Sequence, residues 1–86
     1  MPIVLIPPPY RGPTGGRERI EVTATTVRAC IDAVEAAHPG FAPQVFDATG
    51  EPHKFVKLFI NGDQAPPDTE VAEGDEVEVL AAIAGG

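Results

Sequence analysis

The hydrophobic and polar positions of this chain change their spacing along its length, and each spacing predicts a different element. Residues 3–6 (IVLI) are an unbroken apolar run that three prolines stop, which is typical of a strand buried on both faces. Residues 17–23 alternate between polar and apolar, which predicts a half-buried second strand antiparallel to the first. Between them, PPYRGPTGG (8–16) is rich in proline and glycine and predicts a loop too long for a tight hairpin turn.

A helix is predicted next, because apolar residues now recur at intervals of three and four. Thr25 or Thr26 supplies a hydroxyl that can cap the first turn, and His38-Pro39-Gly40 ends the helix. The apolar stripe of this helix consists of Val27, Cys30, Ile31, Val34 and Ala37.

The second half of the chain begins with a crossing over residues 41–53 that lacks a clear period. Its expected anchors are Phe41, Val45 and Phe46. A third strand is predicted over residues 54–60, where apolar side chains alternate again.

Turn signals define the rest of the predicted fold. Asn61-Gly62 closes the third strand, residues 63–72 form a loop with at most one very short strand, and Glu73-Gly74-Asp75 turns the chain into a final strand over 76–82. This order predicts an α+β fold, with a mixed four- to five-stranded sheet packed on one main helix. We expect a single domain over residues 1–86.

One helix covers only one face of such a sheet, so alternation along the strands predicts which side chains remain outside. We assign the aliphatic positions Val56, Leu58, Ile60, Val77, Val79 and Ala81 to the helix side. Phe55, Phe59 and Leu80 are left beside Lys57 and two glutamates on the open face, and we call these three residues the open-face patch. An apolar patch with a charged rim suits a partner protein. The alternative is that residues 41–53 fold over the rings and make them a second small core.

Composition narrows the classes of partner. The chain has 13 acidic and 6 basic residues and a net charge of −7, which argues against nucleic acid and anionic membranes and favours a basic protein surface. A single cysteine excludes an intramolecular disulfide and fits a reducing compartment. The apolar runs are too short for a membrane span, and no signal peptide is recognisable. We therefore expect a cytoplasmic protein.

No catalytic constellation or metal site is predicted inside the chain. Cys30 lies on the apolar helix stripe, where a cysteine usually acts as a small buried hydrophobe. His38 and His53 lie in separate loops without partners at metal-ligand spacing. The glycines of the 8–16 loop lack the lysine and the following helix of a phosphate loop. An acidic run is interpreted as a solvated face rather than a cation site; its residues are Asp68, Glu70, Glu73, Asp75, Glu76 and Glu78.

The remaining candidate is the end of the sequence, AAIAGG. The final strand should pack up to about Ala81, and residues 82–86 then extend roughly 15 Å at about 3.3 Å per residue. Their side chains are small and the last two residues have none, so they can thread a narrow channel and present a terminal carboxylate. We expect residues 82–86 to be a flexible functional tail; the alternative is a frayed end without function.

Three segments of the sequence resemble the ThiS/MoaD family of ubiquitin-like β-grasp sulfur carriers. They are FVKLFING (55–62), EGDEVEVL (73–80) and IAGG (83–86), in this order and at these distances from the end. PPPYRGPTGG (7–16) is also similar to the first loop of carriers that feed cysteine biosynthesis. The resemblance implies a β-grasp fold and a function as sulfur carrier.

In that family the chemistry is performed on the carrier and not by it. The resemblance implies that a ubiquitin-activating-type enzyme uses Mg-ATP to adenylate the Gly86 carboxylate, that a sulfur donor converts it to a thiocarboxylate, and that a downstream synthase accepts the sulfur. Gly85 would allow close approach, Ile83 and Ala84 would lie in the groove of the activating enzyme, and the open-face patch would dock on it. The carrier itself would bind no cofactor and would not be an enzyme.

Three other functions remain open at this stage. They are the small subunit of a molybdopterin synthase, a protein modifier that joins target lysines through Gly86, and an interaction module with an inert tail. For a carrier, the acceptor is also open between cysteine, the thiamine thiazole, molybdopterin and other sulfur-containing metabolites.

Overall fold

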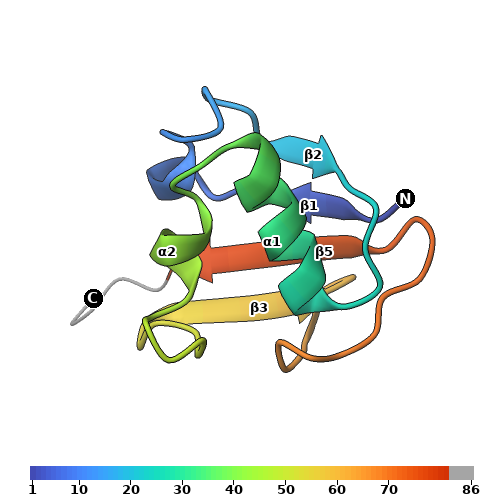
Figure 1. Ribbon diagram of the computed structural model, residues 1–86. Coiled ribbons are helices and arrows are strands. Elements are labelled where there is room, and N and C mark those ends of the chain that lie inside the picture. Colours follow the sequence, from blue (N-terminus) through green and yellow to red (C-terminus); the bar gives the residue numbers. More distant parts are fainter. Residues whose placement is uncertain (82–86) are drawn as a thin grey trace.

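The computed structural model describes residues 1–81, which form a mixed sheet with helices on one side (Figure 1). The elements in chain order are β1 (Ile3–Leu5), the 3-10 turn η1 (Pro8–Tyr10), β2 (Arg19–Glu21), α1 (Val27–Ala37), α2 (Ala42–Val45), β3 (Val56–Ile60), β4 (Asp63–Gln64) and β5 (Glu76–Ala81). The sheet order is β2-β1-β5-β3-β4, with β1 and β5 parallel and the other pairs antiparallel. The predicted mixed sheet packed on one main helix is confirmed, with five strands.

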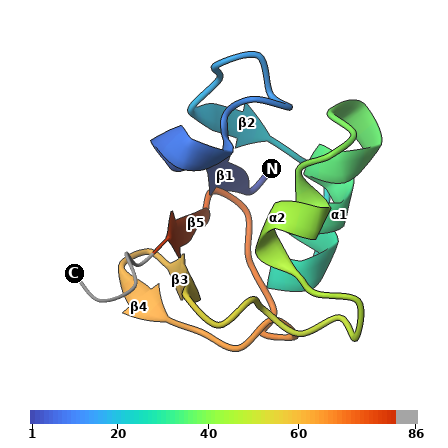
Figure 2. The ribbon, with the colours of Figure 1, turned by 90° about the vertical axis from the view of Figure 1, so that its left-hand side faces the viewer.

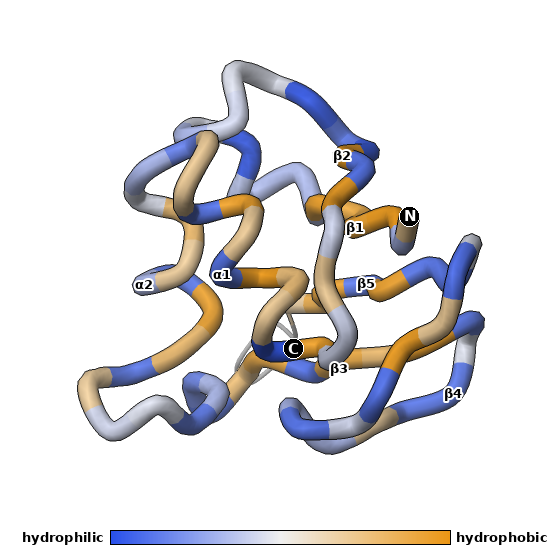
Figure 3. Tube along the Cα trace, turned by 45° about the vertical axis from the view of Figure 1, so that its right-hand side comes forward, coloured by the Kyte–Doolittle hydropathy of each residue, from blue (hydrophilic) through white to orange (hydrophobic). Residues whose placement is uncertain are grey.

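Both helices lie on the same face of the sheet (Figure 2). The core forms between them and the inward strand positions, and Val4, Val77 and Val79 are at most 1% exposed. In Figure 3 the hydrophobic colour follows β1 and β3, whereas the peripheral loops are mostly hydrophilic. The aliphatic positions of β3 and β5 therefore face the helices as predicted, with Ile60 packed partly buried against the core.

The ends of α1 are set by the residues that the sequence indicates. The Thr26 hydroxyl accepts a hydrogen bond from the Ala29 amide at 3.0 Å, so Thr26 and not Thr25 is the cap. At the other end the His38 amide donates to the Val34 carbonyl at 2.7 Å, and Gly40 follows with φ of 105°. Glycine adopts this conformation without steric cost, so the chain can turn away here.

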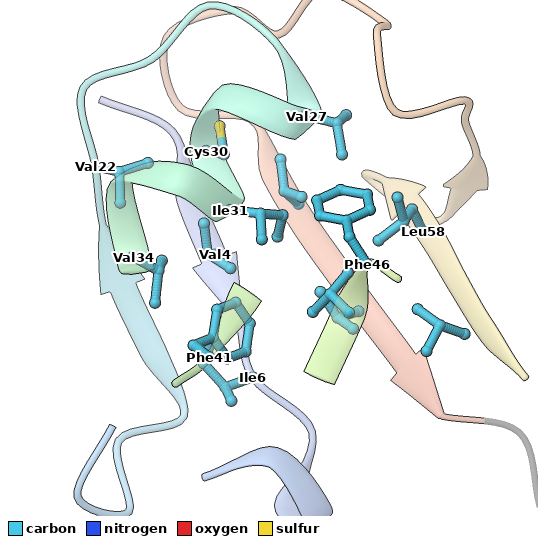
Figure 4. Packing of buried hydrophobic residues seen from close by; sticks show 14 residues of the cluster. Val4, Ile6, Val22, Val27, Cys30, Ile31, Val34, Phe41, Phe46 and Leu58 are labelled. Carbon is cyan, nitrogen blue, oxygen red and sulfur yellow. The ribbon is translucent and has the colours of Figure 1, made fainter. Parts of the chain in front are cut away.

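Residues 41–53 are more regular than the sequence pattern predicts, because they contain α2. Phe41 and Val45 are fully buried, and Phe41 lies in the core together with Phe46 (Figure 4). Pro43 fits in the first turn, where the missing amide proton has no helical acceptor to lose. The predicted anchors are confirmed, while the prediction of an irregular crossing is wrong.

The strands are shorter than the predicted ranges. The third strand begins at Val56 and not at residue 54, because the Val56 amide donates to the His53 carbonyl at 2.9 Å in a turn. The first strand ends at Leu5, and the second covers only residues 19–21 of the predicted 17–23. Phe55 consequently lies on a turn before β3 and not on the strand itself.

The two predicted turns contact each other and fix where β5 begins. The Asp75 carboxylate accepts hydrogen bonds from the Ala72 amide at 2.8 Å and from the Asn61 side chain at 2.9 Å. The Asn61 side-chain oxygen in turn accepts the Glu76 amide at 2.9 Å. Asn61 adopts φ of 49°, a left-handed conformation that asparagine tolerates better than most residues. The Asn61 amide also donates to the Glu76 carbonyl at 2.9 Å, so Asn61 makes three hydrogen bonds from the motif 55–62 to the motif 73–80.

Acidification is expected to loosen this contact. The hydrogen bonds from Ala72 and then from Asn61 hold the pKa of Asp75 below its ordinary value. Because the folded-state pKa is depressed, the carboxylate stabilises the fold above its unfolded pKa of about 3.9, and this contribution is lost as the pH falls through the folded pKa. We expect Asp75→Asn to lower the melting temperature at about pH 6, with a difference from the unaltered chain that shrinks towards about pH 2. A difference that stays constant over this range contradicts the assignment.

Candidate functional site where the chain leaves the sheet

Strand β5 carries the chain to one end of the sheet, between β1 and β3. Its last residue, Ala81, lies opposite Val56 at the start of β3. Figure 2 looks at this end, where the chain leaves β5 with α2 on the helix side. The predicted tail with Ile83, Ala84, Gly85 and Gly86 lies outside the described residues, so the roles assigned to these four stay predictions.

Of the open-face patch, Phe59 and Leu80 lie at strand positions that alternate with the buried Leu58 and Val79, whereas Phe55 lies on the turn before β3. Phe55 is 43% exposed and Leu80 is 40% exposed, while Phe59 is half-buried. Phe55 directly precedes Val56, the partner of Ala81, so Phe55 and Leu80 both lie near the point where the chain leaves β5. Residues 41–53 place their own apolar side chains in the main core and leave these two uncovered. The alternative of a second small core is therefore wrong.

Charged residues alternate with apolar ones across this face. Leu80 is opposite Lys57, and Glu78 lies between Leu5 on β1 and Phe59 on β3. Further out, an Arg19 guanidinium nitrogen lies 3.0 Å from a Glu76 carboxylate oxygen. Sequence reasoning missed Leu5 as part of this face, because the parallel pairing of β1 with β5 has no signal in the local pattern.

The cysteine and histidine residues considered as reactive groups were also located in the structure. Cys30 is fully buried, and burial raises the pKa of its thiol, so the reactive thiolate is disfavoured. The His53 ring nitrogen Nε2 lies 2.7 Å from the Pro43 carbonyl oxygen. Within residues 1–81, no group of three or more histidine, cysteine, aspartate or glutamate side chains could hold a metal ion. What residues 1–81 offer is a docking surface, namely the open face of the sheet near Ala81, where the chain leaves β5.

Comparison with known proteins agrees with this architecture. The model of the ThiS family matches residues 4–86. The sulfur carrier protein CysO of Mycobacterium tuberculosis is 33% identical over 89 aligned positions, covering 96% of each chain. A chain in the crystal structure of the BexX/CysO complex from Amycolatopsis orientalis superposes with a TM-score of 0.91 at 31% identity, covering 100% of both chains. The crystal structure of SAMP1 from Haloferax volcanii gives a TM-score of 0.79 at 28% identity, covering 99% of this chain and 98% of that one.

The fold therefore defines a ubiquitin-like β-grasp protein, as predicted. The chain belongs to the ThiS family, and its CysO relatives are named sulfur carrier proteins, which confirms the predicted family and the predicted class of function. Among residues 1–81, no helix is long and apolar enough to cross a membrane.

Proposed function

We propose that this chain carries sulfur as a thiocarboxylate on Gly86, formed by an adenylating enzyme of the ubiquitin-activating type. The observation that carries the proposal is the family match over residues 4–86, which includes the terminal Gly85-Gly86 pair. The burial of Cys30, the one cysteine, supports it further, because this thiol is a poor alternative carrier of sulfur.

The proposed reaction needs two steps. A carboxylate is a poor acceptor for a nucleophile, so an oxygen of the Gly86 carboxylate first attacks the α-phosphorus of Mg-ATP and pyrophosphate leaves. The resulting acyl-adenylate has a good leaving group. Sulfide then attacks the acyl carbon and AMP leaves, so that Gly86 ends in a thiocarboxylate. The adenylating enzyme supplies the catalytic groups, and the carrier supplies a narrow chain end.

The open-face patch is the proposed docking surface for this enzyme. Phe55 and Leu80 are exposed apolar side chains near the exit of the chain, and Lys57 and Glu78 flank them. A core of apolar contacts with a charged rim is the usual composition of a protein interface. The match to a CysO chain from a complex with BexX supports binding to a partner protein in general. The match to CysO also favours cysteine biosynthesis as the destination of the sulfur.

Intact-mass analysis tests the proposal directly. The full chain is incubated with candidate adenylating enzymes, Mg-ATP and sulfide, and the expected result is the mass gain of one oxygen-to-sulfur exchange. Omission of ATP is the control, and it should remove the gain. An unchanged mass with every adenylating enzyme tried contradicts the proposal.

A second candidate function is that of a protein modifier. It is favoured by the small archaeal modifier protein 1 of Haloferax volcanii, which is 32% identical over 69 positions and covers 79% of each chain. The same incubation, with cell protein added, distinguishes the two. Conjugates to lysine side chains through Gly86 support a modifier, whereas a free thiocarboxylate alone supports the carrier.

A further inference from the structure

A hollow of about 280 Å³ lies beside the exit of the chain, between the open face and the proline loop. Leu80 on β5 and Leu5 on β1 form one wall, and Pro7 and Pro8 at the start of η1 form another. At about 30 Å³ for each water molecule, this volume equals that of about nine waters, enough for one large side chain. Because β1 and β5 are parallel, both run toward the same end of the sheet, where Leu5 lies opposite Glu78 and β5 continues to Ala81 beside the proline loop.

The proline loop that makes the second wall is held in place by its own hydrogen bonds. The Arg11 Nε donates to the Ile6 carbonyl at 2.9 Å, and the Gly16 amide donates to the Arg11 carbonyl at 2.9 Å. The buried Thr14 hydroxyl oxygen lies 3.2 Å and 3.0 Å from the carbonyl oxygens of Arg11 and Arg17. The wall is thus preformed, which lowers the entropy that a partner must remove on binding.

The lining favours a neutral apolar occupant. Two arginines and two glutamates line the hollow, so their formal charges cancel. Arg11 lies 3.6 Å from Glu18, and Arg19 is paired with Glu76 outside the hollow. A charged side chain would lose hydration beside a lining whose formal charges sum to zero, whereas an apolar one would gain the contact area of the leucines and prolines.

The short distance between the hollow and Gly86 indicates which protein can place a side chain in the hollow. Five residues follow Ala81, and they span at most about 18 Å at about 3.6 Å per residue. Any protein that encloses Gly86 must therefore approach the surface around the exit of β5, and Leu80 in the wall of the hollow is adjacent to Ala81. The surface of a tail-binding enzyme therefore lies within about 18 Å of Ala81, and the hollow lies inside this range.

From these observations we infer that the hollow receives one apolar side chain of the adenylating enzyme, and that Leu5, Pro7 and Pro8 are specificity-determining contacts of the carrier. The inference rests on the proposed function. With this hollow, the docking surface includes the proline loop as well as the open-face patch, and β5 lies between them. The alternation pattern of β3 and β5 alone does not indicate the proline loop.

Neighbouring prolines offer a matched pair of variants. Pro8 lines the hollow and Pro9 does not, although both are exposed and both belong to η1. Pro8→Arg and Pro8→Trp should obstruct the hollow, one with charge and one without. Pro9→Arg and Pro9→Trp make the same changes one residue away. Because both positions are exposed, we expect all four variants to melt close to the unaltered chain.

The measurement is carrier-dependent exchange of pyrophosphate into ATP, with an adenylating enzyme that shows this exchange with the full chain. We expect both Pro8 variants to raise the KM for the carrier at least about tenfold with little change in kcat, because they remove binding and not chemistry. Both Pro9 variants should stay within about twofold of the unaltered chain. A second readout is the methyl resonances of Leu5 and Leu80, which should shift on binding while those of Val71 do not.

Failure of the proposed function and failure of this inference alone give different results. If the unaltered chain supports no exchange with any adenylating enzyme tried, the proposed function fails and this inference fails with it. If exchange occurs but the Pro8 variants keep an unchanged KM, the inference alone is overturned. An effect of Pro8→Arg without an effect of Pro8→Trp also overturns it, since charge and not occupancy would then be the cause. A shift of the Leu5 methyls on removal of residues 82–86 from the free chain, without a shift on enzyme binding, would assign the hollow to the chain's own tail.

Discussion

Removal of Gly85 and Gly86 is expected to abolish thiocarboxylate formation completely while leaving the domain folded. Glycine has no side chain to place in a core, and the last core residue among residues 1–81 is Val79. We expect the free energy of unfolding to change by less than about 0.5 kcal/mol, as for substitutions remote from any core. Intact mass after incubation with adenylating enzyme, Mg-ATP and sulfide measures the first effect, and urea unfolding measures the second.

A chain of unchanged length separates the need for a carboxylate from the need for glycine. Gly85→Ala with Gly86→Ala keeps the terminal carboxylate and adds only two methyl groups. If close approach in a narrow channel matters, this double variant should be sulfurated far more slowly than the unaltered chain. Sulfur transfer by the chain that lacks both glycines would show that the reactive group lies elsewhere and would refute the proposal.

Sequence reasoning was most successful where the local pattern alone determines the structure. The helix from Val27 and its Thr26 cap follow from spacing and side-chain chemistry within a few residues. The same holds for the turns at Asn61-Gly62 and Glu73-Gly74-Asp75. Their mutual contact through the Asp75 carboxylate was not predictable, because it joins residues that are distant in sequence.

The elements that the sequence did not indicate depend on tertiary contacts. A single turn such as α2 is too short to produce a helical period, and it is held by burial of Phe41 and Val45 against the core. The parallel pairing of β1 with β5 brings residues from the two ends of the chain together. Leu5 and the proline loop therefore meet Leu80 in a hollow that no local pattern could indicate.

Two phenylalanines, one buried and one exposed, should respond in opposite ways to truncation. Phe41 is fully buried beneath α2, whereas Phe55 is 43% exposed with the Lys54 ammonium 5.4 Å from its ring centroid. Phe41→Ala leaves a cavity and should cost about 3–5 kcal/mol. A domain of this size has a total stability of roughly 4–13 kcal/mol at about 0.05–0.15 kcal/mol per residue, so this variant should lose a large fraction of its stability.

Phe55→Ala is the matched control, because it removes the same atoms from a site that has little packing. Its cost to stability should stay below about 1 kcal/mol, the value of an exposed cation–π contact. Since Phe55 belongs to the open-face patch, this variant should instead raise the KM for the carrier in the pyrophosphate exchange reaction. Urea unfolding compares the two stabilities. Equal stability losses would mean that Phe55 packs as a core residue, and the docking role assigned to it would then have no basis in exposure.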